Sequence, residues 1–286
     1  MSGDGAVRLL HAVAAVRYGG GAAAMSARVR RDGLHAFDAV LAGLSADQAR
    51  EVHDLAEELA GAGAGALLLG EAGYPASLAG VRGAPAALFF TGARSVLDRP
   101  SVGICGSRNA SPNGLRAARL CSEALAARGI GVVSGYARGV DTAAHAGALA
   151  AGGDTVVVLP EGIGRFRLRG GELTRLWDDR RVVVLSQFPP NQPWTAGSAM
   201  ARNAVVSGLG RALVVVEAGD TGGTLAAGLH ALERGRPVFV LEAAGTEAPG
   251  NRRLRERGAV VVRDHEELEH SLEASSAPGP TQLSLI

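Results

Sequence analysis

From Ser101 onward, short apolar runs rich in β-branched residues alternate with segments of helical periodicity, and this alternation constrains the fold more than any other feature. Runs that are apolar throughout are typical of strands buried on both faces, and strands that alternate with helices form parallel sheets. The predicted strands are 102–105, 131–134, 155–159, 182–186, 213–217, 238–241 and 260–262. The predicted helices are 113–128, 142–151, 196–207, 224–234 and 252–257. The sequence therefore predicts an α/β fold with a doubly wound, mainly parallel sheet.

The organisation predicted along the chain has three parts. Residues 1–72 are Ala-rich and mostly helical, with Ser45 as the N-cap of a helix and Gln48 completing a capping box. Residues 73–263 hold the parallel sheet, which starts at Ser101; short strands at 66–69 and 87–91 come before it in the chain. Residues 264–286 combine a short acidic helix at 264–273 with a Ser/Ala/Pro/Gly-rich tail, which we expect to be flexible.

Charge is unevenly distributed along the chain, although the net charge is only +1. Residues 101–263 carry 20 Arg and no Lys against 13 acidic residues, whereas residues 264–286 carry five acidic residues and no Arg. A basic middle favours contact with a polyanion, and the planar guanidinium group binds phosphate and stacks on bases. A GC-rich genome would produce the same excess of arginine, so charge alone leaves both interpretations open.

Cysteine usage and hydropathy indicate the compartment. Cys105 and Cys121 are the only cysteines, and their spacing is not that of a metal site. We find no signal-peptide pattern and no apolar stretch long enough to cross a bilayer. We therefore expect a cytoplasmic protein that uses no metal, no cofactor and no membrane. The aromatic content of 4% argues against a surface built mainly from base-stacking aromatics.

A glycine-rich loop follows the first strand of the parallel sheet, at the edge where such sheets bind ligands. It begins Gly106-Ser107-Arg108 and includes Ser111. Glycine lets backbone N–H groups approach an anion at a helix N-terminus, and the serine hydroxyls are suited to donate to phosphate. The loop lacks the G-x-G-x-x-G pattern, and no acidic residue ends the second strand, which argues against dinucleotide binding.

The loop after the second strand starts at Ser134, and in it Arg138 lies between two glycines, Gly135 and Gly139. An arginine on such a loop suits a phosphate clamp, and Asp141 is well placed to cap the next helix. We interpret His145, one turn into that helix, as a packed or internally hydrogen-bonded residue.

A third loop contains Gly222, Gly223 and Thr224 and forms another helix start that accepts anions. Arg202, on the preceding helix, is expected to face the same crevice. In the arginine-rich segment 252–257, alternating positions cannot all face one way, so we assign only Arg252 or Arg253 to a ligand.

Several of these stretches resemble the signature motifs of the DNA-processing DprA/Smf family. The matching residues are Gly106-Ser107-Arg108, the block from Ser134 to Asp141, His145, Arg202-Asn203, Gly222-Gly223-Thr224, and the lead-in from Tyr74-Pro75. Departures such as Ala204 after the Arg-Asn pair indicate a divergent member.

The resemblance implies an extended Rossmann fold, a homodimer and sequence-independent binding of single-stranded DNA. It also implies protection of that DNA and assistance in loading a RecA-type recombinase during DNA uptake and homologous recombination, without catalysis. By position, the DNA pocket would be lined by Arg108, Ser134, Gly135, Arg138, Gly139, Arg202 and Asn203.

Two other functions on the same fold stay open. A nucleotide phosphoribohydrolase of the lysine-decarboxylase-like (LOG) families needs a glutamate three residues after the Gly-Gly-x-Gly-Thr-type turn, where this chain has alanine. A sensor of a nucleotide second messenger would use the same anion-binding crevice.

The C-terminal residues Gln282, Leu283, Leu285 and Ile286 are similar to short peptides that dock on the bacterial sliding clamp. A Gln side chain and spaced apolar anchors on a tether suit insertion into a preformed pocket. A tail without function would explain the same residues.

Overall fold

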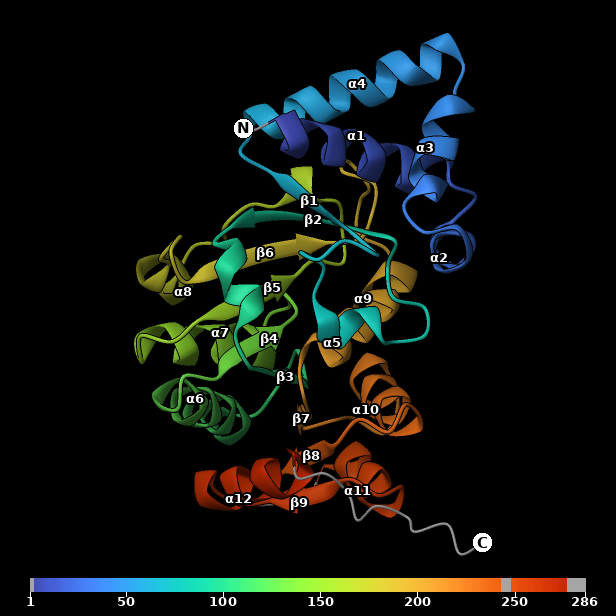
Figure 1. The fold of residues 1–286 in the computed structure, drawn as a ribbon. Helices are drawn as coiled ribbons and strands as arrows, with labels where there is room; N and C mark the ends of the chain where they lie inside the picture. Colours follow the sequence, from blue (N-terminus) through green and yellow to red (C-terminus); the bar gives the residue numbers. More distant parts are fainter. Residues whose placement is uncertain (1–2, 243–247, 277–286) are drawn as a thin grey trace, which may run out of the picture.

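The computed structural model describes residues 3–242 and 248–276, and nine strands within them form a single sheet with helices on both faces (Figure 1). In spatial order the strands are β1 (Gly65–Leu68), β2 (Ala87–Gly92), β6 (Val182–Ser186), β5 (Thr155–Val158), β4 (Gly131–Ser134), β3 (Ser101–Gly106), β7 (Leu213–Val216), β8 (Val238–Leu241) and β9 (Val260–Val262).

The seven strands from β3 to β9 pair in parallel, while β1 and β2 add an antiparallel edge beside β6. The predicted mainly parallel sheet is confirmed. The chain leaves β3 toward β4, β5 and β6 on one side, then crosses to β7, β8 and β9 on the other. The loops after β3 and β7 therefore diverge, and in such sheets the crevice between diverging loops is where ligands bind.

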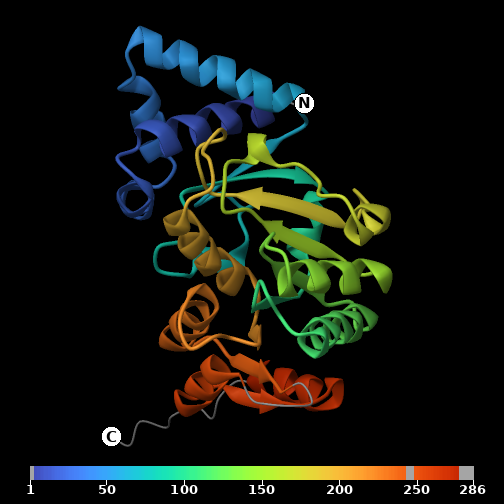
Figure 2. The same cartoon turned by 180° about the vertical axis from the view of Figure 1, so that it is seen from behind.

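Two helical layers cover the sheet (Figures 1 and 2). One layer holds α6 (Pro112–Ala127), α7 (Val140–Ala150) and α12 (His265–Ser276), and the other holds α9 (Ala196–Leu209), α10 (Gly223–Glu233) and α11 (Pro249–Glu256). Successive strand residues point to opposite faces. Val132 accordingly joins the core under α6 and α7, whereas Val133 joins the larger core on the other face.

The N-terminal helices α1 (Gly3–Tyr18), α2 (Ala22–Asp32), α3 (His35–Ala42) and α4 (Ala46–Gly61) form a lobe at the antiparallel edge (Figure 1). Helix α1 contacts β1 and β2, and its Leu9 and Val13 are fully buried. The predicted capping box is confirmed: the Gln48 N–H donates to Ser45 Oγ (3.3 Å), and the Ser45 N–H donates to Gln48 Oε1 (2.9 Å). The domain boundary after residue 72 stays a prediction, and β1 already belongs to the sheet.

Four short elements complete the fold: α5 (Ala76–Ala79), η1 (Arg94–Asp98), η2 (Ile163–Arg165) and α8 (Glu172–Leu176). Helix α12 corresponds to the acidic helix predicted at 264–273. The residues compared with clamp-binding peptides lie outside the described part of the chain. Over residues 3–242 and 248–276, none of the helices has both the length and the apolar character needed to cross a bilayer.

Candidate functional site

A pocket of about 450 Å³ opens at the carboxyl edge of the sheet, beside the crevice between β3 and β7. The three glycine-rich loops and helix α9 all contribute to its wall. The lining residues are Cys105, Gly106, Ser107, Arg108, Gly135, Ala137, Asp141, Trp194, Ala196, Ala199, Met200, Arg202, Asn203, Val206, Gly219, Thr221, Gly223 and Thr224. We call this the loop pocket.

A buried arginine dominates the electrostatics of the loop pocket. The side chain of Arg202 is only 7% exposed; its Nη1 donates to the carbonyl oxygen of Val158 (3.2 Å) and lies 3.7 Å from Asp141 Oδ2. Its Nε is buried, and no residue in the described ranges accepts a hydrogen bond from it. Burial lowers the pKa of Arg202, and the Asp141 carboxylate opposes that shift. A cation with an unused donor is therefore held at the wall of the pocket.

Gly135 makes room for this arginine. A Cβ placed on Gly135 would lie 1.3 Å from Nη1 of Arg202 and 2.4 Å from Asp141 Oδ2. No side chain is compatible with that packing, so the glycine is required by close approach. Gly139 has a different role: its φ of 84° is a left-handed conformation, and a Cβ there would lie 2.4 Å from the carbonyl oxygen of Ser107. The two loops are thus packed backbone against backbone.

The other predicted site residues are placed as follows. Gly106, Ser107, Arg108, Asn203, Gly223 and Thr224 line the pocket with Gly135 and Arg202. Arg138 is exposed at its margin, where it donates to Asn109 Oδ1 (2.8 Å). Ser134 is fully buried and donates to the carbonyl oxygen of Ile104 (2.6 Å), away from the lining. Gly139 lies behind the lining, Gly222 is the N-cap of α10, and Arg253 donates to the carbonyl oxygen of Asp220 (2.8 Å).

The N-terminus of α6, a candidate anion site from its sequence, is already occupied by a carboxylate of this chain. Glu217, at the end of β7, adopts a left-handed φ of 50° that turns it toward α6. Its carboxylate accepts hydrogen bonds from the backbone N–H of Ser111 (2.7 Å) and from the Ser111 hydroxyl. Ser111, predicted to donate to phosphate, instead caps α6 and binds Glu217. This arrangement leaves α7, α9 and α10 to supply the helix N-termini near the pocket.

The structure corrects the prediction for Asp141. Gly139 is the N-cap of α7, so Asp141 lies inside the first turn and caps nothing; its carboxylate accepts from the Ala137 N–H (3.2 Å) and pairs with Arg202. His145 is buried as interpreted. Its Nε2–H donates to the carbonyl oxygen of Gly135 (2.5 Å), and its Nδ1 lies within hydrogen-bond distance (2.6 Å) of the Thr155 hydroxyl, which itself donates to the carbonyl oxygen of Val132 (2.9 Å).

Burial lowers the pKa of His145, which makes stability depend on pH. In the unfolded chain the imidazole gains a proton near pH 6.5, whereas the folded protein resists protonation to lower pH. The free energy of unfolding should therefore be retained above pH 6.5 and fall as pH decreases below it, by up to about 1.4 kcal/mol per pH unit. Urea unfolding of the wild type and His145→Gln from pH 7.5 to 5 measures this, and the variant should show the flatter profile. Parallel profiles would contradict it.

A family model described as DNA recombination-mediator protein A matches residues 65–273, which is most of the chain. The chain belongs to this family. It is 35% identical over 205 residues to protein Smf of Escherichia coli and 32% identical over 191 residues to DNA processing protein DprA of Streptococcus pneumoniae. The matches cover 70% and 66% of this chain, and 54% and 67% of those relatives. The chain therefore spans only about half the length of the E. coli protein.

Solved structures of this family share the fold. The crystal structure of DprA from Streptococcus pneumoniae superimposes with a TM-score of 0.75 at 24% identity, covering 91% of this chain and 97% of that one. A structure of DprA from Helicobacter pylori, described in terms of its single-stranded DNA binding mode, gives a TM-score of 0.65 at 24% identity and covers 74% and 96%.

Two apolar residues of the loop pocket in this DprA-family chain were not predicted from its sequence. Trp194, 48% exposed, precedes α9, and the Arg108 guanidinium carbon lies 5.8 Å from the centroid of its ring. Met200, on the first turns of α9, is 39% exposed. Trp194 directly follows Pro193 and is one of only two tryptophans in the chain, and this was the one signal in the sequence that pointed to it.

Proposed function

We propose that this chain binds single-stranded DNA in the loop pocket, without preference for base sequence and without covalent chemistry. The observation that carries the proposal is Arg202: a buried guanidinium that lines the pocket and has an Nε without a partner in the described structure. A buried donor left unsatisfied costs about 1–3 kcal/mol, and a phosphate oxygen would satisfy it with a charge-assisted hydrogen bond. Family membership supports the same ligand.

The composition of the pocket favours a single strand. Arg108 and the glycine backbone supply contacts suited to phosphate, while Trp194 and Met200 offer apolar surface to a base. A base reaches such a surface only when it is unstacked, as in single strands. Stacking on an aromatic ring accepts every base, and phosphate contacts carry no sequence information.

The lining residues support binding rather than catalysis. Their only carboxylate, Asp141, is paired with Arg202. Burial raises the pKa of the Cys105 thiol to about 12, so it stays protonated at neutral pH. Where a LOG-type hydrolase would need its glutamate, Ala227 is buried within α10. Among the described residues that line the pocket, we find no group suited to act as general base at a ribose, which supports the proposal.

We further propose that the chain acts as a homodimer that protects the bound strand and passes it to a RecA-type recombinase. Support for this step comes from the family, whose model is described as a recombination mediator. Docking of residues 282–286 on a sliding clamp stays a prediction, and deleting them should remove clamp capture while leaving DNA affinity unchanged.

One titration tests the proposal for the loop pocket. Labelled single-stranded DNA, duplex DNA and free nucleotides are titrated by fluorescence anisotropy at several salt concentrations, while released base is assayed. We expect the tightest binding to the single strand, an affinity that falls steeply with salt, and no released base. Preference for a mononucleotide, or release of base, would refute the proposal.

Arg138→Ala refines that test. Arg138 is exposed, and Asn109 is the only described residue with which its side chain forms a hydrogen bond, so its loss should leave the melting temperature nearly unchanged. If it contacts one phosphate, affinity should fall several-fold and the salt slope should decrease by about 0.7. Unfolding in parallel with lost binding would instead assign Arg138 a structural role.

A further inference from the structure

A second group of arginines lies near the loop pocket, on the segment after β5. Arg165, Arg167 and Arg169 are exposed and alternate with the half-buried Phe166 and Leu168. None of the ion pairs within the described ranges includes these three arginines; the Arg167 guanidinium reaches only backbone carbonyls, those of Gly164 and Phe166. We call residues 165–169 the basic loop.

Aromatic packing connects the basic loop to the pocket. Tyr136 is buried, and its neighbours in sequence, Gly135 and Ala137, line the pocket. Its ring centroid lies 5.5 Å from that of Phe166. Phe166 in turn stacks on Trp177 at 5.8 Å. The backbone N–H of Arg169 donates to the Tyr136 hydroxyl (2.7 Å), and the Arg169 guanidinium carbon lies 4.4 Å from the Tyr136 ring centroid. The loop is therefore anchored on the same segment that forms the pocket wall.

Backbone hydrogen bonds connect the basic loop to the other wall as well. The N–H of Gly162 donates to the carbonyl oxygen of Gln192 (2.9 Å), and that of Gly164 donates to the carbonyl oxygen of Pro190 (3.0 Å). This partner segment continues directly to Trp194 at the pocket. The basic loop thus adjoins both the Tyr136 segment and the segment that carries Trp194.

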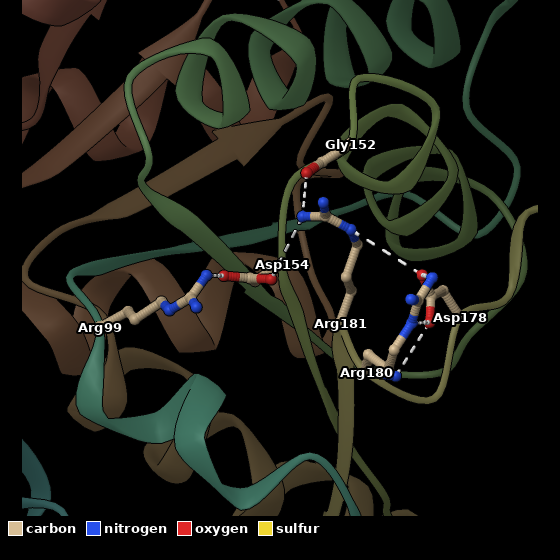
Figure 3. Close-up of polar contacts among 6 residues, drawn as sticks. All are labelled: Arg99, Gly152, Asp154, Asp178, Arg180 and Arg181. Carbon is tan, nitrogen blue, oxygen red and sulfur yellow. Dashed lines mark hydrogen bonds and ion pairs between the residues drawn. The ribbon is translucent and has the colours of Figure 1, made fainter.

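Three arginines at the opposite edge of the sheet are paired with carboxylates. Before β5 and β6, Asp154 pairs with Arg99 and Arg181, and Asp178 pairs with Arg180 (3.0 Å) and Arg181 (3.9 Å) (Figure 3). A high content of arginine therefore does not by itself produce a group of unpaired cations. The basic loop combines cationic groups that have no carboxylate partner among the described residues with a scaffold packed against the loop pocket.

We propose that the basic loop binds the phosphates of nucleotides that continue from the strand held in the loop pocket. This inference rests on the proposed function and extends it from a single-nucleotide pocket to a path along a polymer. A mononucleotide held in the loop pocket has no neighbouring nucleotide whose phosphate could reach the basic loop. The ligand class is therefore a polynucleotide. The guanidiniums contact the strand after the pocket is filled, so their contribution depends on strand length.

The test compares short and long oligothymidines, of about 4 and about 16 nucleotides, on the full chain. The variant is Arg165→Gln/Arg167→Gln/Arg169→Gln. The matched control is Arg82→Gln/Arg234→Gln/Arg257→Gln, which removes the same charge from exposed arginines that form no ion pair with a described residue; Arg234 and Arg257 are the C-caps of α10 and α11, at the opposite sheet edge. For the long strand we expect the variant to lose at least tenfold in affinity and about 2 units of salt slope. For the short strand the affinity should change less than twofold.

Three outcomes would overturn the inference: an unchanged affinity for the long strand, an equal loss in the control, or an equal loss for both strand lengths. Arg165→Lys/Arg167→Lys/Arg169→Lys keeps the charge and should retain the salt slope, which guards against a folding defect in the glutamine variant. If wild-type protein binds neither oligothymidine, the proposed function itself fails. If the wild-type protein binds DNA but the glutamine variant shows no defect that depends on strand length, only the inference about the basic loop is overturned.

Discussion

Arg202→Ala should reduce the affinity for single-stranded DNA by about 100-fold or more and lower the free energy of unfolding by about 3–5 kcal/mol. The two effects have separate causes. Binding is lost because the guanidinium that lines the pocket is removed. Stability is lost because the carboxyl group of Asp141, a buried residue with 6% exposure, loses the cation that pairs with it. Anisotropy titration and urea unfolding measure the two quantities on the same preparation.

A double variant separates folding from ligand contact. Arg202→Met/Asp141→Asn replaces the buried pair by uncharged residues of similar size, and such replacements are often neutral for stability. The asparagine can still accept the hydrogen bond from the Ala137 N–H. We expect stability to recover most of the loss while DNA binding stays absent. Recovery of binding together with stability would show that Arg202 holds the fold and does not touch DNA.

Gly135→Ala should weaken single-stranded DNA binding by at least tenfold, although it changes no charge. The added Cβ would occupy the position of Arg202 Nη1, at 1.3 Å, so the guanidinium or the loop must move. Overpacking of this kind costs about 1–3 kcal/mol of stability. Because the ligand site depends on where Arg202 lies, affinity should fall even in molecules that remain folded.

Gly197→Ala is the matched control for that substitution. Gly197 lies in the first turn of α9, next to the pocket-lining Ala196, and a Cβ there would meet only Thr195 Oγ1, at 3.9 Å. Alanine favours a helix over glycine by up to about 1 kcal/mol, so this variant should bind DNA normally and melt at the same or a higher temperature. If Gly135→Ala binds as well as this control, the position of Arg202 does not matter for the ligand.

The structure shows which of the arginines counted in the sequence are paired with carboxylates. Some of the arginines are paired with carboxylates: Arg99, Arg180 and Arg181 form ion pairs at the amino edge of the sheet (Figure 3). Exposed ion pairs add little stability, but they cancel charge locally. At the carboxyl edge, Arg108, Arg138 and the arginines of the basic loop form no ion pair with a described residue, so they are the cations that we propose for contact with a polyanion.

Local patterns predicted most of the architecture. Each parallel strand is a short apolar run that its own residues identify, and the glycine-rich loops follow those strands directly, so strands, loops and their common edge were all predictable. Ser45 and Gln48 meet across three residues, which is why the capping box could be identified. The resemblance to DprA/Smf motifs likewise lies in contiguous residues, and the family match confirms it.

Contacts between distant segments could not be predicted in the same way. Glu217 reaches Ser111 across 106 positions, and Arg202 pairs with Asp141 from a different helix. Neither pairing leaves a periodic or compositional trace, because each depends on the relative placement of two elements after the sheet has assembled. Helical and strand periodicity reflects neighbours along the chain, whereas the identity of a buried ion pair reflects which loops converge. Sequence thus identified the loops that line the pocket, and packing decided which of their side chains face it.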